Sequence, residues 1–181
     1  MTVQSRRRVD TRRAPSSHHL AFDLHEIAEA PRAWQFALMA YETKTRQTEV
    51  SVADYVAALD NPRRRADAEA LIHLMGEISG LPAKLWGPTM IGFGNIRYTY
   101  DSGHTGTMFR FGFAPRAANT VIYASWGFEG AEGLIGRLGK VKRSKACLYV
   151  NKLDDIDMGV LREFLQRGFA ESYRAHPEDE G

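Results

Sequence analysis

Residues 85–100, LWGPTMIGFGNIRYTY, separate a helical first part of the chain from a part rich in strands. A tryptophan, a Gly-Pro pair and two glycines around Phe93 come first, and residues 96–100 then alternate between apolar or aromatic and polar side chains. Such alternation is typical of a half-buried strand. We therefore expect residues 85–95 to form a loop that lines a pocket, and residues 96–100 to begin the sheet.

Two helices are predicted before this stretch, over residues 52–60 and 62–79. Ser51 and Asn61 are favourable N-caps, and a proline is tolerated at the first position of the second helix because its missing amide proton would have no partner there. In both segments apolar residues recur at intervals of three and four, which predicts one buried face per helix. Gly80 ends the second helix.

Strands and turns follow this stretch. Residues 101–106 are rich in turn formers and connect the first strand to residues 109–113, whose alternation places Phe109, Phe111 and Phe113 on one face. Four further elements are expected: strands over 120–124 and 146–150, and helices over 129–138 and 157–172. Strands joined by such short turns cannot be parallel, so the order predicts an α+β fold, a mainly antiparallel sheet of four or more strands with flanking helices.

The composition fits one globular domain with an extension. The chain has 181 residues, of which 44% are hydrophobic, enough for one core. Residues 1–42 carry arginine clusters near their beginning and show no sustained amphipathic pattern, so we expect a disordered basic N-terminal extension. Residues 1–38 are predicted to be dispensable for folding, with Met39 as a natural start. The domain is predicted over residues 43–174, followed by a frayed C-terminus over 175–181.

Charge and cysteine content exclude several classes of protein. Residues 39–181 hold eighteen Lys and Arg against eighteen Asp and Glu, which argues against a general nucleic-acid-binding domain. No apolar run approaches the length of a membrane span. The single cysteine, Cys147, excludes an intramolecular disulfide and fits a reducing cytoplasm. Together these three observations predict a cytoplasmic protein with no nucleic-acid or membrane partner. Its place within a strand predicts buried packing for Cys147.

Residues able to bind metal are scattered along the chain. Asp154, Asp155 and Asp157 precede the last predicted helix, where carboxylates are favoured as caps, and we interpret them as caps. Three of the six histidines lie within the first 25 residues, and neither His73 nor His104 has an evident partner at ligand spacing. We predict no metal or cofactor and identify no catalytic constellation, so any enzymatic reaction is left unassigned.

Several short motifs carry a family resemblance: Trp-Gly-Pro at 86–88, Gly-Phe-Gly at 92–94, Tyr-Thr-Tyr at 98–100, and the segments 112–116 and 139–149. In these motifs the chain resembles the YdhG-like family, also called DUF1801, over roughly residues 43–172. The resemblance implies a frataxin-like α+β sandwich, and some relatives are described as iron chaperones. Frataxin-like iron binding uses a ridge of carboxylates, whereas the first helix here offers Asp54 and the second begins with three arginines. Iron binding is therefore the alternative function.

Aromatic and basic residues favour a small-molecule-binding module. Lys140, Lys142, Arg143 and Lys145 crowd one turn, where they either pair with a phosphate or carboxylate or complement the dipole of the preceding helix. Aromatic residues with polar tips are typical of ligand pockets and also of cores. We expect an anionic metabolite between the 86–93 loop and this basic turn, with glycines allowing close backbone approach. The predicted ligand-binding residues are Trp86, Phe93, Tyr98, Tyr100, Arg116, Tyr123, Lys140, Lys142 and Lys145.

Overall fold

The computed structural model describes residues 45–99, 103, 105–124 and 127–177. Residue contacts divide the chain into two units, residues 1–42 and residues 43–181, and every described residue belongs to the second. The predicted N-terminal extension lies outside the described residues, as do Tyr100 and His104.

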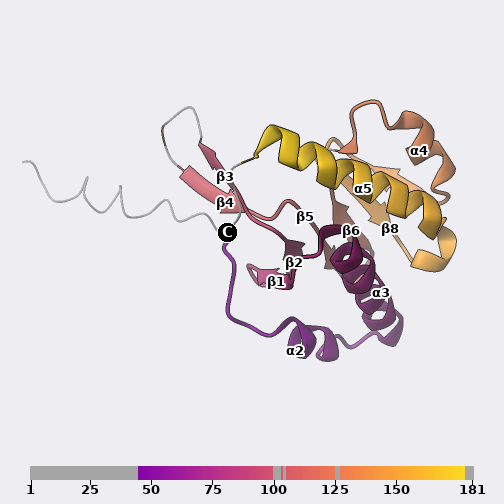
Figure 1. Cartoon of the computed structure of the whole chain (residues 1–181). Coiled ribbons are helices and arrows are strands. Elements are labelled where there is room, and N and C mark those ends of the chain that lie inside the picture. The colour runs from indigo at the N-terminus through magenta and orange to yellow at the C-terminus, as the bar shows by residue number, and fades with distance from the viewer. Residues whose placement is uncertain (1–44, 100–102, 104, 125–126, 178–181) are drawn as a thin grey trace, which may run out of the picture. The chain divides into compact units, whose positions relative to one another are not determined.

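Four α-helices occur in the described part of the chain: α2 (Val52–Ala57), α3 (Pro62–Ser79), α4 (Glu132–Arg137) and α5 (Met158–Ala175) (Figure 1). All four predicted helices are present. Their caps are local: the Ser51 hydroxyl accepts a hydrogen bond from the amide of Asp54, and Asn61 Oδ1 accepts from two amides in the first turn of α3. Gly80 ends α3 in the left-handed conformation, with φ at 67°.

Six strands form one antiparallel sheet in the order β1-β2-β5-β6-β8-β7, and β3 and β4 form a separate two-stranded ribbon. The strands of the sheet are β1 (Ala83–Trp86), β2 (Met90–Phe93), β5 (Phe111–Pro115), β6 (Thr120–Tyr123), β7 (Val141–Arg143) and β8 (Cys147–Val150). The ribbon consists of β3 (Ile96–Thr99) and β4 (Thr105–Met108). Every described strand pairing is antiparallel, so the predicted α+β class is confirmed.

The expected loop over residues 85–95 is instead a hairpin. β1 and β2 pair, with Leu85 opposite Ile91 and Trp86 opposite Met90, around a turn in which Gly87 has φ 55°. Leu85 and Ile91 are both buried, so their burial favours the strand conformation over an open loop. The basic turn is also partly strand, because residues 141–143 form the edge strand β7.

The prediction that Phe109, Phe111 and Phe113 share one face is wrong. The chain bends between β4 and β5, where the amide of Arg110 donates to the carbonyl of Phe93 at 3.0 Å, so the alternation does not continue through the bend. Phe111 and Phe113 join the main core. Phe109 lies over Gly92 on the opposite side, where a Cβ added to that glycine would be 2.4 Å from the phenylalanine side chain.

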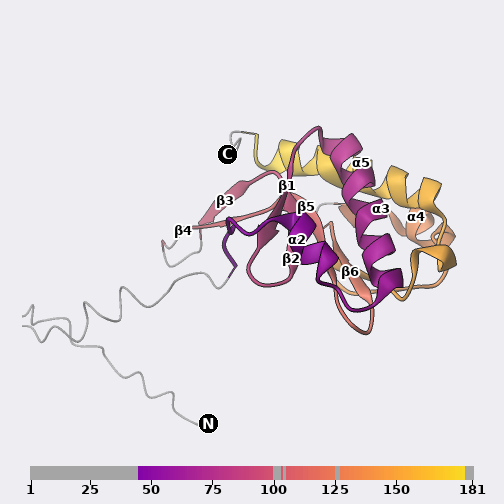
Figure 2. The ribbon, with the colours of Figure 1, turned by 90° about the horizontal axis from the view of Figure 1, so that it is seen from below.

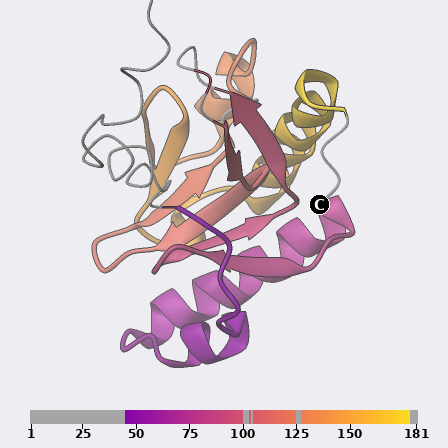
Figure 3. The ribbon, with the colours of Figure 1, turned by 90° about the vertical axis from the view of Figure 1, so that its left-hand side faces the viewer.

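The described helices pack against one face of the sheet. Ile91, Phe113, Ile122 and Leu148 lie side by side across four strands and form one core with the buried apolar residues of all four helices. Figures 2 and 3 show α3 and α5 against this same side. Alternate strand residues point to the opposite face, on which no described helix packs, and we call it the helix-free face. Its principal residues are Trp86, Phe109, Ala114, Val121, Tyr123, Cys147, Tyr149 and Lys142.

Candidate functional site

Two rows of side chains cross the helix-free face. The first row, from β7 to β5, is Lys142, Tyr149, Val121 and Ala114. The second row, from β8 to β1, is Cys147, Tyr123, Gly112, Gly92 and Lys84. The register of the sheet therefore brings together residues that are more than 30 positions apart in the sequence.

Aromatic rings cover the glycines of the second row. The ring of Phe109 packs edge-on against Trp86, with centroids 5.8 Å apart. It lies tilted against Tyr123 at the same centroid distance. Trp86 is 1% exposed, and its indole N–H is enclosed without a hydrogen-bond partner among the described residues. We expected Gly92 to let a ligand approach the backbone closely. Instead, the side chain of Phe109 occupies the space beside Gly92. Trp86 contributes packing at this edge of the face.

Arg116 and Tyr123 form the polar centre of the helix-free face. Arg116 Nη2 donates a hydrogen bond of 2.9 Å to the Tyr123 hydroxyl. Burial raises the pKa of Tyr123, and the positive charge of Arg116 opposes this shift without cancelling it. The phenol is therefore neutral at neutral pH. Because its oxygen accepts from Arg116, its own proton is available for donation to an acceptor above the sheet.

The charge on this sheet is entirely positive. Its six strands contain no aspartate or glutamate, whereas they include Lys84, Lys142 and Arg143. The exposed side chains of Lys140, Lys142, Arg143 and Lys145 have no hydrogen bond or ion pair with a described residue. Lys142 lies beside Tyr149, two strand spacings, or roughly 10 Å, from the backbone of β6. Lys142 and the Arg116–Tyr123 pair thus border one part of the face.

The structure brings together some of the predicted ligand-binding residues. Arg116, Tyr123 and Lys142 share the helix-free face. Trp86 lies on the same face but far from Lys142, because β1 and β7 are opposite edges of the sheet. Five strand spacings, roughly 24 Å, separate these two edges. The candidate site is therefore centred on Arg116 and Tyr123 and not on the 86–93 segment.

Other predicted ligand-binding residues lie elsewhere. Phe93 faces the helices, 1% exposed and with its ring centroid 5.6 Å from that of Phe111. Tyr98 is on the β3–β4 ribbon, where its ring lies against Gly106. Lys140 precedes β7 and Lys145 follows it, both exposed.

Cys147 differs from its sequence-based interpretation. It is half-buried and not buried, and it lies opposite Tyr123 in the register of β6 and β8. Tyr149, two residues further on, is also half-buried and on the same face. The site therefore has a partly exposed border on β8. Side chains alternate between the two faces of a strand, so the burial of Leu148 and Val150 implies that Cys147 and Tyr149 face the other side.

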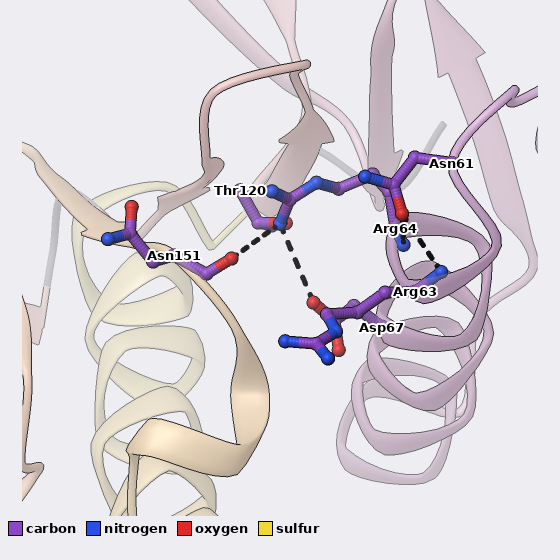
Figure 4. Close-up of polar contacts among 6 residues, drawn as sticks. All are labelled: Asn61, Arg63, Arg64, Asp67, Thr120 and Asn151. Carbon is purple, nitrogen blue, oxygen red and sulfur yellow. Dashed lines mark hydrogen bonds and ion pairs between the residues drawn. The ribbon is translucent and has the colours of Figure 1, made fainter.

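A second polar cluster lies on the helix-covered side (Figure 4). Arg64 is 6% exposed, and its Nη1 is 3.0 Å from both Thr120 Oγ1 and the carbonyl of Asn151, and 3.5 Å from the carboxylate of Asp67. Burial raises the pKa of Asp67, although Arg64 and a backbone hydrogen bond oppose the shift. These contacts join α3 to the start of β6 and the residue after β8, so the cluster holds the helix on the sheet.

Sequence reasoning noted Arg64 only as one of three arginines at the start of the second helix and so missed this role. Its spacing held the signal, because Arg64 precedes Ala68 by four residues and Leu71 by seven, on the buried face of α3. Arg110 is similar: its guanidinium donates to the carbonyls of Ser172 and His176 at 3.0 and 2.9 Å and lies 3.6 Å from the centroid of Tyr173. It therefore caps the C-terminus of α5, where positive charge is favourable.

Side chains of the types that bind metal ions are dispersed in the described part of the chain. No group of three or more His, Cys, Asp or Glu side chains there could hold a metal ion. Asp157 is the N-cap of α5, as predicted, whereas Asp154 and Asp155 lie in the preceding turn and do not cap this helix. Asp155 pairs with Lys152 at 3.3 Å. His73 has a carboxylate neighbour that sequence reasoning overlooked, Glu77 at 3.6 Å.

Comparison of the chain with models of protein families, with curated proteins and with solved structures finds no match. The resemblance to the YdhG-like family rests on the sequence motifs and stays a prediction. None of the helices described is long and apolar enough to cross a membrane.

Proposed function

We propose that this domain is a small-molecule-binding module that holds an anionic metabolite, with a phosphate or carboxylate group, on its helix-free face. The observation that carries the proposal is the 2.9 Å hydrogen bond from Arg116 to Tyr123, which holds a guanidinium beside a neutral phenol. Arginine binds phosphate and carboxylate through paired N–H groups, and this bond engages one nitrogen, so further donors remain for a ligand.

The surroundings favour an anion over a cation. The strands beneath the site carry no carboxylate, so no internal anion competes for Arg116 on the sheet. Lys142 adds a second positive charge across Tyr149, and the Tyr123 hydroxyl supplies a neutral donor. Two cations and one hydroxyl form a donor set typical of sites that hold one anionic group.

Calorimetric titration of the full chain with inorganic phosphate and with citrate tests this proposal. We expect both anions to bind, with an affinity that falls as ionic strength rises. Arg116→Gln should weaken binding roughly tenfold or more, because charge-assisted hydrogen bonds of this kind contribute about 1.5–3 kcal/mol. Tyr123→Phe should weaken it by a smaller factor.

Lys84→Gln is the matched control, since Lys84 is an exposed lysine of the same face, three strands away from Tyr123. It should bind anions as the unmodified chain does. Equal losses in Lys84→Gln and Arg116→Gln would show a general charge effect and contradict a site at Arg116. Absence of any binding of phosphate and citrate would contradict the proposal as a whole.

A further inference from the structure

A groove of about 520 Å³ lies between α2, α3 and β1, away from the helix-free face. This volume is within the range of small-molecule pockets. Its lining includes the apolar side chains of Val52, Val56, Ile72 and Ala83. α2 has only six residues, of which Val56 alone is buried, and Tyr55 ties it to the β1–β2 turn through a hydrogen bond of 3.2 Å to the carbonyl of Thr89. The groove is the space that this short helix leaves beside α3.

Two opposite charges line the groove one helical turn apart. Arg65 and Glu69 are at positions i and i+4 of α3, a spacing at which such residues commonly pair. Here they form no ion pair with each other: Arg65 Nη2 donates to the carbonyl of Leu59 at 2.8 Å, and its Nε is enclosed without a partner among the described residues. Glu69 is exposed and has no ion pair with a described residue.

Arg65 Nε is enclosed and so has no access to the groove, whereas Nη1 is not enclosed and has no hydrogen bond with a described residue. A ligand oxygen at Nη1 would form a charge-assisted hydrogen bond there. A ligand with a carboxylate alone would also meet the negative charge of Glu69, which disfavours it. A ligand with both a carboxylate and an ammonium group satisfies Arg65 and Glu69 together.

We propose that this groove binds an aliphatic α-amino acid in its zwitterionic form. The carboxylate pairs with the Arg65 guanidinium, the ammonium group pairs with Glu69, and the aliphatic side chain packs on Val52, Val56 and Ile72. The apolar lining sets the preference for a hydrocarbon side chain over a polar one. This site is independent of the anion site at Arg116.

The test compares L-leucine with two analogues that each lack one charge, using calorimetry on the full chain. 4-Methylpentanoate lacks the ammonium group, and 3-methylbutylamine lacks the carboxylate. L-Leucine should bind at least tenfold more tightly than either analogue and should raise the melting temperature in proportion to its saturation of the site. Equal binding of the three compounds, or no binding of L-leucine, would overturn the proposal.

Variants assign the two charges. Glu69→Gln should weaken the binding of L-leucine at least tenfold, so that its affinity no longer exceeds that of 4-methylpentanoate. Because Glu69 is exposed, this variant should fold normally. In Arg65→Gln, L-leucine should bind no more tightly than 3-methylbutylamine. Ala53→Phe fills the groove from α2 without changing a charge and should abolish binding.

Arg63→Gln and Glu132→Gln are the matched controls, being exposed helical residues outside the groove lining. Both should bind L-leucine as the unmodified chain does. Unchanged binding in Glu69→Gln and Ala53→Phe would show that L-leucine binds elsewhere and would overturn the assignment. Arg116→Gln should leave L-leucine binding unchanged, which separates this site from the anion site.

Discussion

The two faces of the six-stranded sheet use the same strands but meet different surroundings. On the helix-covered face Phe113, Ile122 and Leu148 are fully buried under helices. On the helix-free face Trp86, Ala114 and Val121 are also buried, but Tyr123 and Tyr149 are half-buried and Lys142 is exposed. Apolar burial is the main source of folding stability, so the helix-covered face should carry most of it. The helix-free face carries the polar groups of the proposed anion site, and substitutions can separate stability from the proposed binding.

The largest expected difference is between two aromatic residues, one on each face. Phe113→Ala should lower the free energy of unfolding by about 3–5 kcal/mol, because it leaves a cavity in a core position that is 0% exposed. Tyr149→Ala, on the helix-free face, should cost about 1 kcal/mol. Urea unfolding followed by circular dichroism measures both. Similar losses would show that the two faces contribute equally to stability.

Glycines beneath Phe109 provide a second comparison. Gly112→Ala should destabilise the fold by about 1–3 kcal/mol, because its Cβ would lie 2.4 Å from the backbone carbonyl oxygen of Ile91, which cannot easily move. The control is Gly133→Ala in α4, where an added Cβ has no neighbour within 4 Å and alanine favours the helix by roughly 0.5–1 kcal/mol. Stabilisation by both substitutions would contradict the close approach of the Ile91 carbonyl oxygen to Gly112.

Asp67 tests how far water is excluded on the helix-covered side. Burial raises the pKa of Asp67 above its ordinary value of 3.8, so in the interval between these two pKa values the folded protein holds a proton that the unfolded chain has lost. The Asp67 contribution to the free energy of unfolding is therefore largest below pH 3.8 and is lost as pH rises through the folded pKa. Asp67→Asn cannot titrate and lacks this contribution.

Urea unfolding of both proteins across this pH interval measures the effect. The free energy of unfolding of the unmodified protein should rise relative to that of Asp67→Asn as pH falls. We expect this change to be smaller than the losses caused by Phe113→Ala and Gly112→Ala. A constant difference would show that burial and the opposing interactions cancel, and a difference that grows as pH rises would show that Arg64 and the other opposing interactions outweigh burial. Either result would contradict a raised pKa of Asp67.

The smallest expected effect on stability is at Lys142. Its side chain is exposed and has no ion pair with a described residue, so Lys142→Gln should change the free energy of unfolding by less than about 0.5 kcal/mol. Phosphate binding should nevertheless fall severalfold if Lys142 borders the proposed anion site. Parallel unfolding and phosphate titration distinguish the two effects, and unchanged phosphate affinity would remove Lys142 from the site.

The sequence by itself determined the features that depend on a few neighbouring residues. Ser51, Asn61 and Asp157 cap their helices through hydrogen bonds to amides two or three positions away, and each was predictable from residue type. The strands over residues 120–123 and 147–150 follow from local apolar and β-branched composition. The apolar period in α3 similarly predicted one buried face for that helix. Arg116, Tyr123 and Lys142 were identifiable as candidate ligand-binding residues from their chemistry.

Only the tertiary structure decided which of these residues meet. The bend before Arg110 reverses the face of Phe109, and no alternation within the segment indicates where a strand stops. Arg64 and Arg110 are buried because distant carbonyls, at Asn151 and Ser172, accept from them. Lys142 and Tyr123 share a face because β8 pairs with both β6 and β7. Strand order and register come from long-range packing, which a local pattern does not contain, and a shift of one residue would place each side chain on the opposite face.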